Sequence, residues 1–537
     1  MSLLSTERLA DAAARPLSPH ALKAMLADGG ELALIDLREE LIFSQSHLLF
    51  ARSLPLSRLE LKFAQLVPRR GTRIVLCDDG DGLVARAAEI LRGAGYRDLS
   101  YLDGGIKGWE SAGLLLFSGV NVPSKAFGEF VEHARGTPSI DAAELERLIR
   151  SGTDMVVLDS RPFDEYQRVS IPTGVNVPGA ELVLRVHDLA PSPDTLVVVN
   201  CAGRTRSIIG AQSLINAGVP NKVVALRNGT MGWNLAGFTP DSGKDNRAPD
   251  VSHGGLAWAK AAVEGVAGKL AIHSIDQSAL ARLRADESRT LYLFDVRGPA
   301  EYAAGHVAGA LSAPGGQLVQ ATDQYAGTLG ARIVCVDDKE ARAVMTASWL
   351  RQMGWREVSV LVASGDETGF PASPVLAEAP KDAAIAAVTL NDLLLRTDVT
   401  VIDVSLSRRY QEAHIRGAWF AIRARLAQAL GKIKPGGMVV LTSEDGVLAG
   451  LAAADARALT MAPVRYLAGG NAAWHDAGFP LTKDDPRSAD EPVDAWLKPY
   501  ERPDGVKQAM ADYLAWETDL LPRIARDGCA QFSRFPQ

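Results

Sequence analysis

Short runs of apolar residues recur along the chain in a pattern that repeats four times. Each repeat holds a run that ends in or just after an Asp, and the four runs read LIDLR, VLDSR, LFDVR and VIDVS. Their aspartates are Asp36, Asp159, Asp295 and Asp403. A Ser or Thr, residue types that cap helix N-termini, begins a helix-like stretch before each run. The pattern therefore predicts a helix and then a buried strand at the start of every repeat.

A second apolar run follows in each repeat, and these runs read RIVLC, LVVVNC, RIVCV and MVVLT. The first Asp and the residue that closes the second run lie 41, 42, 41 and 39 residues apart, counted to Cys77, Cys201, Val336 and Thr442. Apolar runs that alternate with helix-like stretches are typical of β-α-β units, in which helices cover both faces of a parallel sheet.

The matched spacing predicts an α/β protein of four tandem domains, each a parallel sheet flanked by helices. Linkers rich in Pro, Gly, Ser and charged residues separate the repeats. Beyond the fourth repeat, apolar residues at helical spacing predict a C-terminal helical extension. The expected domains are residues 15–120, 135–245, 270–375 and 385–485, with the extension in residues 486–537.

The composition is that of an ordinary globular protein. Of 537 residues, 47% are hydrophobic and 23% are charged, which excludes a disordered chain, a collagen and a small disulfide scaffold. The formal net charge of −7 argues against a nucleic-acid-binding protein. No apolar run reaches the roughly 20 residues that span a bilayer, and the N-terminus lacks the apolar segment of a secretory leader. The four cysteines form no CxxC pair, so we expect a cytoplasmic protein with free thiols and no zinc site.

The second repeat combines a thiol with two arginines. Its second apolar run leads into Cys201, and a helix-like stretch begins soon after Arg204 and Arg206. A thiol between a strand end and a helix start faces unpaired backbone N–H groups and the positive end of the helix dipole. These groups and the two arginines favour the thiolate, which is the nucleophilic form. The same donors can hold an anionic substrate or a persulfide.

Two other interpretations of this segment are weaker. A half-buried cysteine with solvent-facing arginines would not explain its place at the carboxyl edge of a parallel sheet, where α/β proteins bind ligands. Phosphatases also place Cys before Arg-Ser/Thr on a cradle loop, but their signature has His before the Cys and five residues between Cys and Arg. Here Asn200 precedes Cys201, and only four residues separate it from Arg206. The shorter loop suits a sulfur atom better than a phosphate.

The Asp-x-Arg strand, the Cys-x-x-x-x-Arg-Ser loop and a Gly-Trp turn that reaches Trp233, 32 residues after Cys201, resemble a rhodanese domain. From about residue 15 to 485, the chain resembles the four-repeat rhodanese-like sulfurtransferases. The resemblance implies a sulfane-sulfur transferase that uses thiosulfate or another persulfidic donor and needs no metal or organic cofactor. Cys201 matches the family nucleophile. The resemblance also assigns donor binding to Ala202, Gly203, Arg204, Thr205, Arg206 and Ser207, and support of the loop to Asp159 and Arg161.

This chemistry predicts two half-reactions. The Cys201 thiolate attacks the outer sulfur of the donor while Arg204 and Arg206 stabilise the departing sulfite. The persulfide then passes its sulfur to cyanide, a thiol or a protein cysteine, which predicts ping-pong kinetics. The expected partners are a small anionic sulfur donor and a thiol acceptor, with neither nucleic acid nor membrane.

The other three repeats lack this loop. Cys77 in the first repeat stands before Asp78, Asp79 and Asp81, and nearby negative charge disfavours a thiolate and repels an anionic donor. The third and fourth repeats carry Val336 and Thr442 where the spacing places the nucleophile. We expect all three to be inactive, and we expect the third and fourth repeats to serve in packing or docking. Sulfur relay through Cys77 or Cys529 stays open, as does the alternative of a non-enzymatic rhodanese-repeat scaffold or persulfide carrier.

Overall fold

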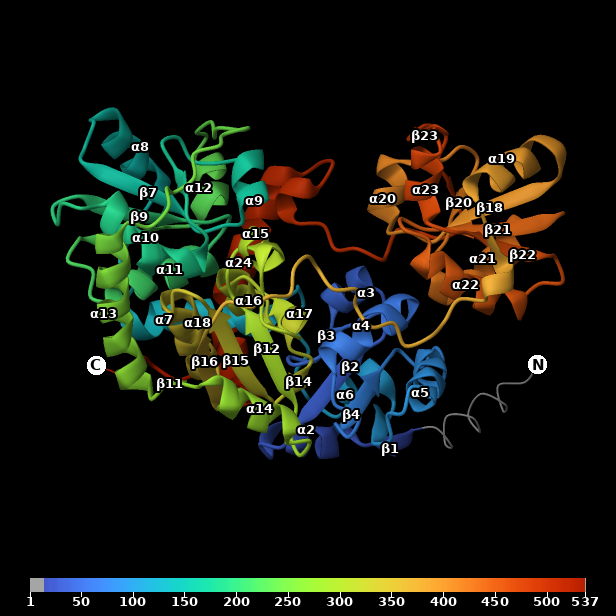
Figure 1. The fold of residues 1–537 in the computed structure, drawn as a ribbon, viewed down its shortest axis with the longest axis horizontal. Coiled ribbons are helices and arrows are strands. Elements are labelled where there is room, and N and C mark those ends of the chain that lie inside the picture. Colours follow the sequence, from blue (N-terminus) through green and yellow to red (C-terminus); the bar gives the residue numbers. More distant parts are fainter. Residues whose placement is uncertain (1–13, 537) are drawn as a thin grey trace. The chain divides into compact units, whose positions relative to one another are not determined.

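The computed structural model describes residues 14–536, and it confirms the predicted α/β fold of four tandem domains followed by a C-terminal helix (Figure 1). Most of the segment in which we expect no secretory leader lies in residues 1–13, outside the described residues. Within the described part of the chain, no helix is both long and apolar enough to cross a bilayer. The chain divides into two compact units. One holds most of the first domain and the fourth domain, in residues 14–21, 34–119 and 373–496. The other holds the second and third domains, the C-terminal segment and a short part of the first domain, in residues 120–372, 497–536 and 22–33.

The second domain has the predicted parallel sheet, in the order β6-β10-β9-β7-β8. Its central strands are rich in Val and Leu, as expected for a sheet covered on both faces. A linker helix, α7 (Val122–Arg135), precedes the domain. The elements are β6 (Ser139–Ile140), α8 (Ala142–Arg150), β7 (Met155–Asp159), α9 (Phe163–Arg168), β8 (Val175–Asn176), η2 (Gly179–Glu181), α10 (Leu182–Leu189), β9 (Leu196–Asn200), α11 (Thr205–Asn216), β10 (Val223–Leu226) and α12 (Gly229–Leu235).

The third domain repeats this order as β11-β16-β15-β12-β13. In its described residues no helix follows the last strand of the sheet, where the other domains have their Trp-bearing helix. The elements are α13 (His253–Leu270), β11 (His273–Ser274), α14 (Gln277–Ala285), β12 (Leu291–Asp295), α15 (Pro299–Ala304), β13 (Leu311–Ser312), α16 (Gly315–Gln320), α17 (Thr322–Tyr325), β14 (Thr328–Leu329), β15 (Arg332–Asp337), α18 (Ala341–Gln352) and β16 (Glu357–Val362).

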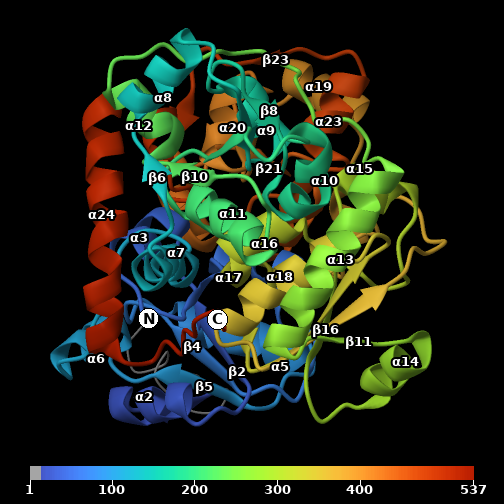
Figure 2. The ribbon, with the colours of Figure 1, turned by 90° about the vertical axis from the view of Figure 1, so that its left-hand side faces the viewer.

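The second and third domains share one hydrophobic core. Leu158 and Ala211 of the second domain belong to the same buried cluster as Phe294, Cys335 and Val344 of the third. Helix α13 contacts both α10 and α18 and so joins the two domains (Figure 2). Cys335 lies completely buried in this core, and burial and then the Asp337 charge raise the pKa of its thiol.

The first domain pairs its strands in the order β1-β5-β4-β2, with β3 beside β2. Its elements are β1 (Arg15–Leu17), α2 (Pro19–Ala27), β2 (Leu32–Asp36), α3 (Glu40–Gln45), β3 (Arg52–Ser53), η1 (Leu56–Arg58), α4 (Leu59–Leu66), β4 (Ile74–Cys77), α5 (Leu83–Gly93), β5 (Leu99–Leu102) and α6 (Gly105–Ser111).

The fourth domain has the order β17-β22-β21-β18-β20-β24. Its elements are η3 (Lys381–Ala383), β17 (Ala384–Ile385), α19 (Ala387–Arg396), β18 (Val399–Asp403), α20 (Ser407–Glu412), β19 (His414–Ile415), β20 (Trp419–Phe420), η4 (Arg423–Arg425), α21 (Leu426–Ile433), β21 (Met438–Thr442), α22 (Val447–Arg457), β22 (Val464–Leu467), α23 (Gly470–Asp476), β23 (Leu481–Thr482) and β24 (Arg487–Ser488).

The C-terminal extension contains η5 (Pro499–Glu501) and the long helix α24 (Val506–Asp527). Helix α24 lies along α7 and contacts α12 of the second domain (Figure 2). Its buried residues recur at helical spacing along one face, which explains why the sequence pattern revealed the helix. The extension therefore packs against the second domain.

Candidate functional site

Cys201 directly follows strand β9 and lies in the short loop before α11. Only 2% of the residue is exposed, and its sulfur donates to the Ser207 hydroxyl at 3.5 Å. Ser207 in turn donates to the Arg204 carbonyl at 2.8 Å, so the loop folds back on itself around the thiol. The predicted strand–Cys–helix junction is thus present, and the thiol lies inside it.

A buried network of polar side chains connects the sheet to this loop. Arg161 donates to both carboxylate oxygens of Asp159, at 2.8 and 2.6 Å, and to the Val169 carbonyl at 2.6 Å. The Asn200 side chain donates to Asp159 at 2.9 Å. Thr230 accepts from Asn200 at 3.3 Å and donates to the Cys201 carbonyl at 3.1 Å. Asp159 and Arg161 therefore reach the thiol loop only through other residues.

The guanidinium of Arg204 is fully engaged by neighbouring side chains. Two bonds of 2.7 Å join it to the Glu129 carboxylate on α7, and it also contacts Glu132 on the same helix. Its remaining nitrogen donates to the Asn228 side chain at 3.2 Å. Burial opposes the charge of Arg204, but Glu129 and Glu132 outweigh it and raise the pKa. The side chain fastens the loop to α7, which the sequence analysis did not foresee.

Arg206 is the arginine whose charge acts on Cys201. It donates to Glu165 at 2.7 Å and to Gln317 of the third domain at 3.1 Å. Burial favours its neutral form, but attraction to Glu165 and to the Cys201 sulfur outweighs burial and raises the pKa of Arg206. A cation in this place attracts an anion that binds in the loop.

The C-terminal extension covers the thiol loop, a contribution that the sequence analysis missed. Met510 and Leu514 form a small apolar cluster with Ala202 and Met231, and Tyr500 and Tyr513 pack against it. The buried Glu517 accepts from the Thr205 hydroxyl at 3.3 Å. The available signal was the amphipathic pattern of residues 506–527, which predicts a packed helix without saying what it packs against.

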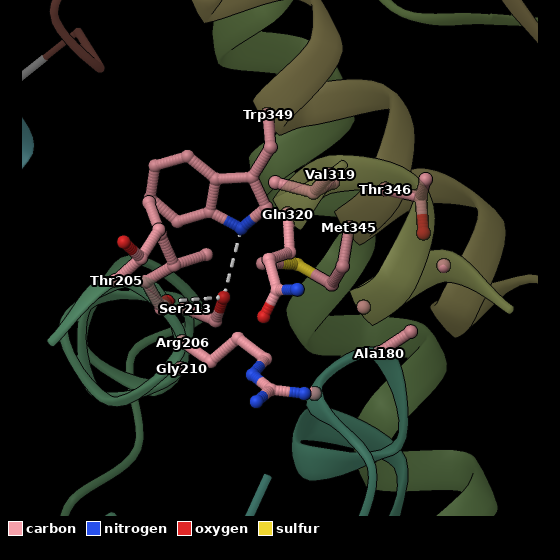
Figure 3. Close-up of a pocket in the computed structure, with 14 residues that line it drawn as sticks. Ala180, Thr205, Arg206, Gly210, Ser213, Val319, Gln320, Met345, Thr346 and Trp349 are labelled. Atoms are coloured by element: carbon pink, nitrogen blue, oxygen red, sulfur yellow. Dashed lines mark hydrogen bonds between the residues drawn. The ribbon is translucent and has the colours of Figure 1, made fainter. Parts of the chain in front are cut away.

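A narrow cavity lies beside the loop, between α11 and the α16 and α18 helices of the third domain. Figure 3 shows Arg206 and Trp349 among its walls, and the Trp349 indole donates to Ser213 at 2.8 Å. Its volume of about 30 Å³ leaves room for about two water molecules. Cys201 is not among the residues that line it.

The strand registers correct the match between repeats. In each domain one residue at or next to the end of the second long strand accepts a hydrogen bond from the backbone N–H that follows the Asp of the first strand. These residues are Cys77, Asn200, Val336 and Thr442, and the distances are 3.0, 2.9, 3.0 and 2.9 Å. Cys77 is therefore equivalent to Asn200, and the residues that match Cys201 are Asp78, Asp337 and Ser443. The prediction that Cys77, Val336 and Thr442 stand at the nucleophile position is wrong by one residue. The equal separation of 41 residues from Asp159 to Asn200 was the signal that could have shown it.

In these three domains an oxygen occupies the place of the thiol. Asp78 accepts from the backbone N–H groups of Gly80 and Val84, at 2.9 and 3.1 Å. Ser443 accepts from those of Gly446 and Ala449, at 3.1 and 3.2 Å. The loop donors that could hold an anionic donor are thus already used by the protein's own side chains.

The third domain keeps an arginine, Arg342, at the position of Arg206. Its guanidinium bonds to Asp337 at 3.0 Å and to Glu301 at 2.7 Å, and Asp337 also accepts from the Arg342 backbone N–H at 2.9 Å. The same arginine reaches Glu181 of the second domain at 2.8 Å. In the third domain, the loop that corresponds to the Cys201 loop therefore holds a cluster of ion pairs, and this cluster joins the second and third domains.

The remaining candidate residues do not gather at a second site. Cys77 is buried, and burial and then the Asp36 charge raise the pKa of its thiol well above the usual value. Cys529 is also buried, and burial raises its pKa. Within residues 14–536 no group of three or more His, Cys, Asp or Glu side chains is arranged to hold a metal ion.

The model of the rhodanese-like domain matches the chain four times, at residues 18–112, 141–236, 276–365 and 386–477. The chain belongs to the rhodanese-like domain family. The crystal structure of thiosulfate sulfurtransferase from Pseudomonas aeruginosa is similar to this chain at a TM-score of 0.94 and 47% sequence identity, and the match covers 97% of this chain and all of that one (100%). The resemblance to rhodanese seen in the sequence is confirmed.

Curated relatives match single segments of the rhodanese-like chain. A probable 3-mercaptopyruvate sulfurtransferase of Pseudomonas aeruginosa is 33% identical over 130 residues, which are 23% of this chain and 45% of the relative. An HTH-type transcriptional regulator of Mycobacterium tuberculosis is 35% identical over 121 residues, 22% of this chain and 50% of the relative. The chain spans about half the length of the curated relatives it matches.

Proposed function

We propose that this protein is a sulfurtransferase that moves a sulfane sulfur from thiosulfate, or a similar anionic donor, through a persulfide on Cys201 to a thiol or cyanide. The observation that carries the proposal is the Cys201 loop, in which a thiol faces the start of α11 next to the Arg206 charge. The similar solved structure is itself named as a thiosulfate sulfurtransferase, which supports the same donor.

In the first half-reaction the Cys201 thiolate attacks the outer sulfur of thiosulfate. A new S–S bond forms, the old S–S bond breaks, and sulfite leaves with the electron pair. Arg206 and the backbone N–H groups of the loop stabilise the developing charge on sulfite. Arg204 keeps the loop in place through Glu129 and Glu132, in contrast to the role beside sulfite that the resemblance suggests.

In the second half-reaction a nucleophile attacks the outer sulfur of the Cys201 persulfide. Cyanide leaves as thiocyanate, a thiolate leaves as a persulfide, and the Cys201 thiolate is regenerated in both cases. Asp159 and Arg161 position the loop through Asn200 and Thr230 and do not touch the reacting atoms.

Because all four thiols are unpaired, we also propose a cytoplasmic location, where thiols stay reduced.

The experiment compares thiosulfate:cyanide sulfur transfer by the wild type, Cys201→Ser and Cys77→Ser. We expect Cys201→Ser to lose at least about a thousandfold in kcat, because the covalent intermediate cannot form. Cys77→Ser is the matched control and should stay within about twofold, since this thiol is buried outside the loop. After incubation with thiosulfate alone, the Cys201 peptide of the wild type should gain one sulfur by mass spectrometry.

Activity that survives in Cys201→Ser would contradict the proposal. A persulfide on Cys201 without turnover in cyanide would instead favour a persulfide carrier.

A further inference from the structure

A lysine outside all four rhodanese-like domains shares a carboxylate with Arg206. Lys498 lies beyond the last matched residue, 477, in the C-terminal extension. Its ammonium group contacts one carboxylate oxygen of Glu165 at 3.0 Å, and the other oxygen accepts from Arg206 at 2.7 Å. Lys498 is therefore linked through a single carboxylate to the arginine whose charge acts on the Cys201 sulfur.

Without Lys498, carboxylates would outnumber cations around the thiol loop. Apart from the Asp159–Arg161 pair, whose charges cancel, the other cations paired there among the described residues are Arg204, Arg206 and Lys125, and the carboxylates are Glu129, Glu132, Glu165 and Glu517. Lys498 supplies the fourth cation and balances the charge. A dianionic donor would be repelled by a net negative loop, and charges near a partly buried site are only weakly screened.

The fold holds Lys498 in this place. Its backbone N–H donates to Glu501 at 3.1 Å at the start of η5, and the neighbouring Tyr500 packs against the cluster that includes Ala202. Burial opposes the charge of Lys498, but Glu165 outweighs it and raises the pKa, so the side chain remains cationic near neutral pH. The C-terminal extension therefore holds the lysine next to Glu165.

We propose that Lys498 is a specificity-determining residue that makes the Cys201 site selective for anionic sulfur donors. The inference rests on the proposed function. By sharing Glu165, Lys498 leaves part of the Arg206 charge uncompensated at the sulfur, where the donor anion binds.

The test uses Lys498→Met and Lys498→Arg, with Lys507→Met as the matched control. Lys507 is an exposed lysine at the start of α24, so the control removes the same charge from the same segment. Two readouts are needed. One is the steady-state kinetics of thiosulfate:cyanide sulfur transfer. The other is the rate at which the Cys201 peptide is alkylated by iodoacetate, an anion, and by iodoacetamide, its neutral analogue.

For Lys498→Met we expect the KM for thiosulfate to rise about tenfold with kcat within about twofold, and the iodoacetate-to-iodoacetamide rate ratio to fall several-fold. Lys498→Arg should stay near the wild type, and Lys507→Met should match it.

An unchanged ratio in Lys498→Met would overturn the inference, and so would equal slowing of both reagents, which indicates a distorted loop. If the ratio falls as expected while the wild type shows no thiosulfate turnover, the proposed function fails and charge selection at Cys201 stands. The two failures are therefore distinguishable.

Discussion

Arg204 precedes helix α11 and Arg206 lies in its first turn, and the two side chains have the same chemistry, yet the fold gives them different roles. Arg204 is held by two glutamates of α7, whereas Arg206 shares one carboxylate with Lys498. Breaking a buried ion pair from one side is strongly destabilising, roughly 3–5 kcal/mol, because it leaves an uncompensated charge. Loss of Arg204 is therefore expected to destabilise the Cys201 loop.

At the same scale, Glu39 makes the unit of the first and fourth domains sensitive to pH. It is buried, its carboxylate accepts from Ser57, and burial followed by repulsion from Asp494 raises its pKa to about 7. Between pH 4.5 and 7 the folded state then binds more protons than the unfolded state, so stability falls as pH rises through this window. Above pH 7, the buried Glu39 carboxylate lowers the free energy of unfolding by about 3 kcal/mol.

We expect Glu39→Gln, which keeps an acceptor for Ser57, to be more stable than the wild type at pH 8 and about equal to it at pH 4. Denaturant unfolding at the two pH values measures this. Glu110→Gln, at an exposed site on α6, is the control and should change little at either pH. Equal stabilisation of Glu39→Gln at both pH values would contradict the assignment.

At the scale of elements, the strand registers decide which loops can react. Asp78, not Cys77, stands at the position of Cys201, and its carboxylate occupies the backbone N–H groups of Gly80 and Val84. Cys77 ends strand β4 and is completely buried. The first domain therefore has a thiol next to its loop but none inside it.

This register predicts the outcome of moving a thiol by one residue. In native protein we expect iodoacetamide to leave Cys77 unmodified, because burial raises its pKa and blocks access. Asp78→Cys should become modified at residue 78, since that side chain faces the start of α5. Peptide mass spectrometry after timed alkylation measures both. Faster modification of Cys77 than of the introduced thiol would show that the register is wrong.

At the scale of the whole molecule, the third domain is part of the structure around Cys201. It supplies Gln317 to Arg206, it shares a core with the second domain, and its Arg342 bonds to Glu181 of that domain. Its loop has no thiol, but an altered loop can still hold two domains together. This supports the hypothesis that the third repeat serves in packing.

A consequence is that the second and third domains should unfold together. We expect Arg342→Ala to cost roughly 3–5 kcal/mol, because Asp337 and Glu181 lose a buried partner, and to raise hydrogen exchange in α11 of the second domain. Arg282→Ala, at an exposed site on α14, should leave both unchanged. Faster exchange confined to the third domain would contradict the shared unit.

The repeats, the strand–helix order and the candidate thiol are properties that the sequence alone determined. They follow from local periodicity and from a motif of seven consecutive residues, Cys201 to Ser207, so no distant contact is needed to see them. The C-terminal helix was visible for the same reason, from its apolar face.

Only the tertiary structure decided what surrounds the thiol. Glu129, Gln317 and Lys498 come from a linker helix, another domain and the C-terminal extension, and no local pattern says which buried or charged side chains meet across such separations. The one-residue shift at Cys77 has a related cause. Side chains alternate between the faces of a strand, and the pairing of neighbouring strands shows which residue enters the loop.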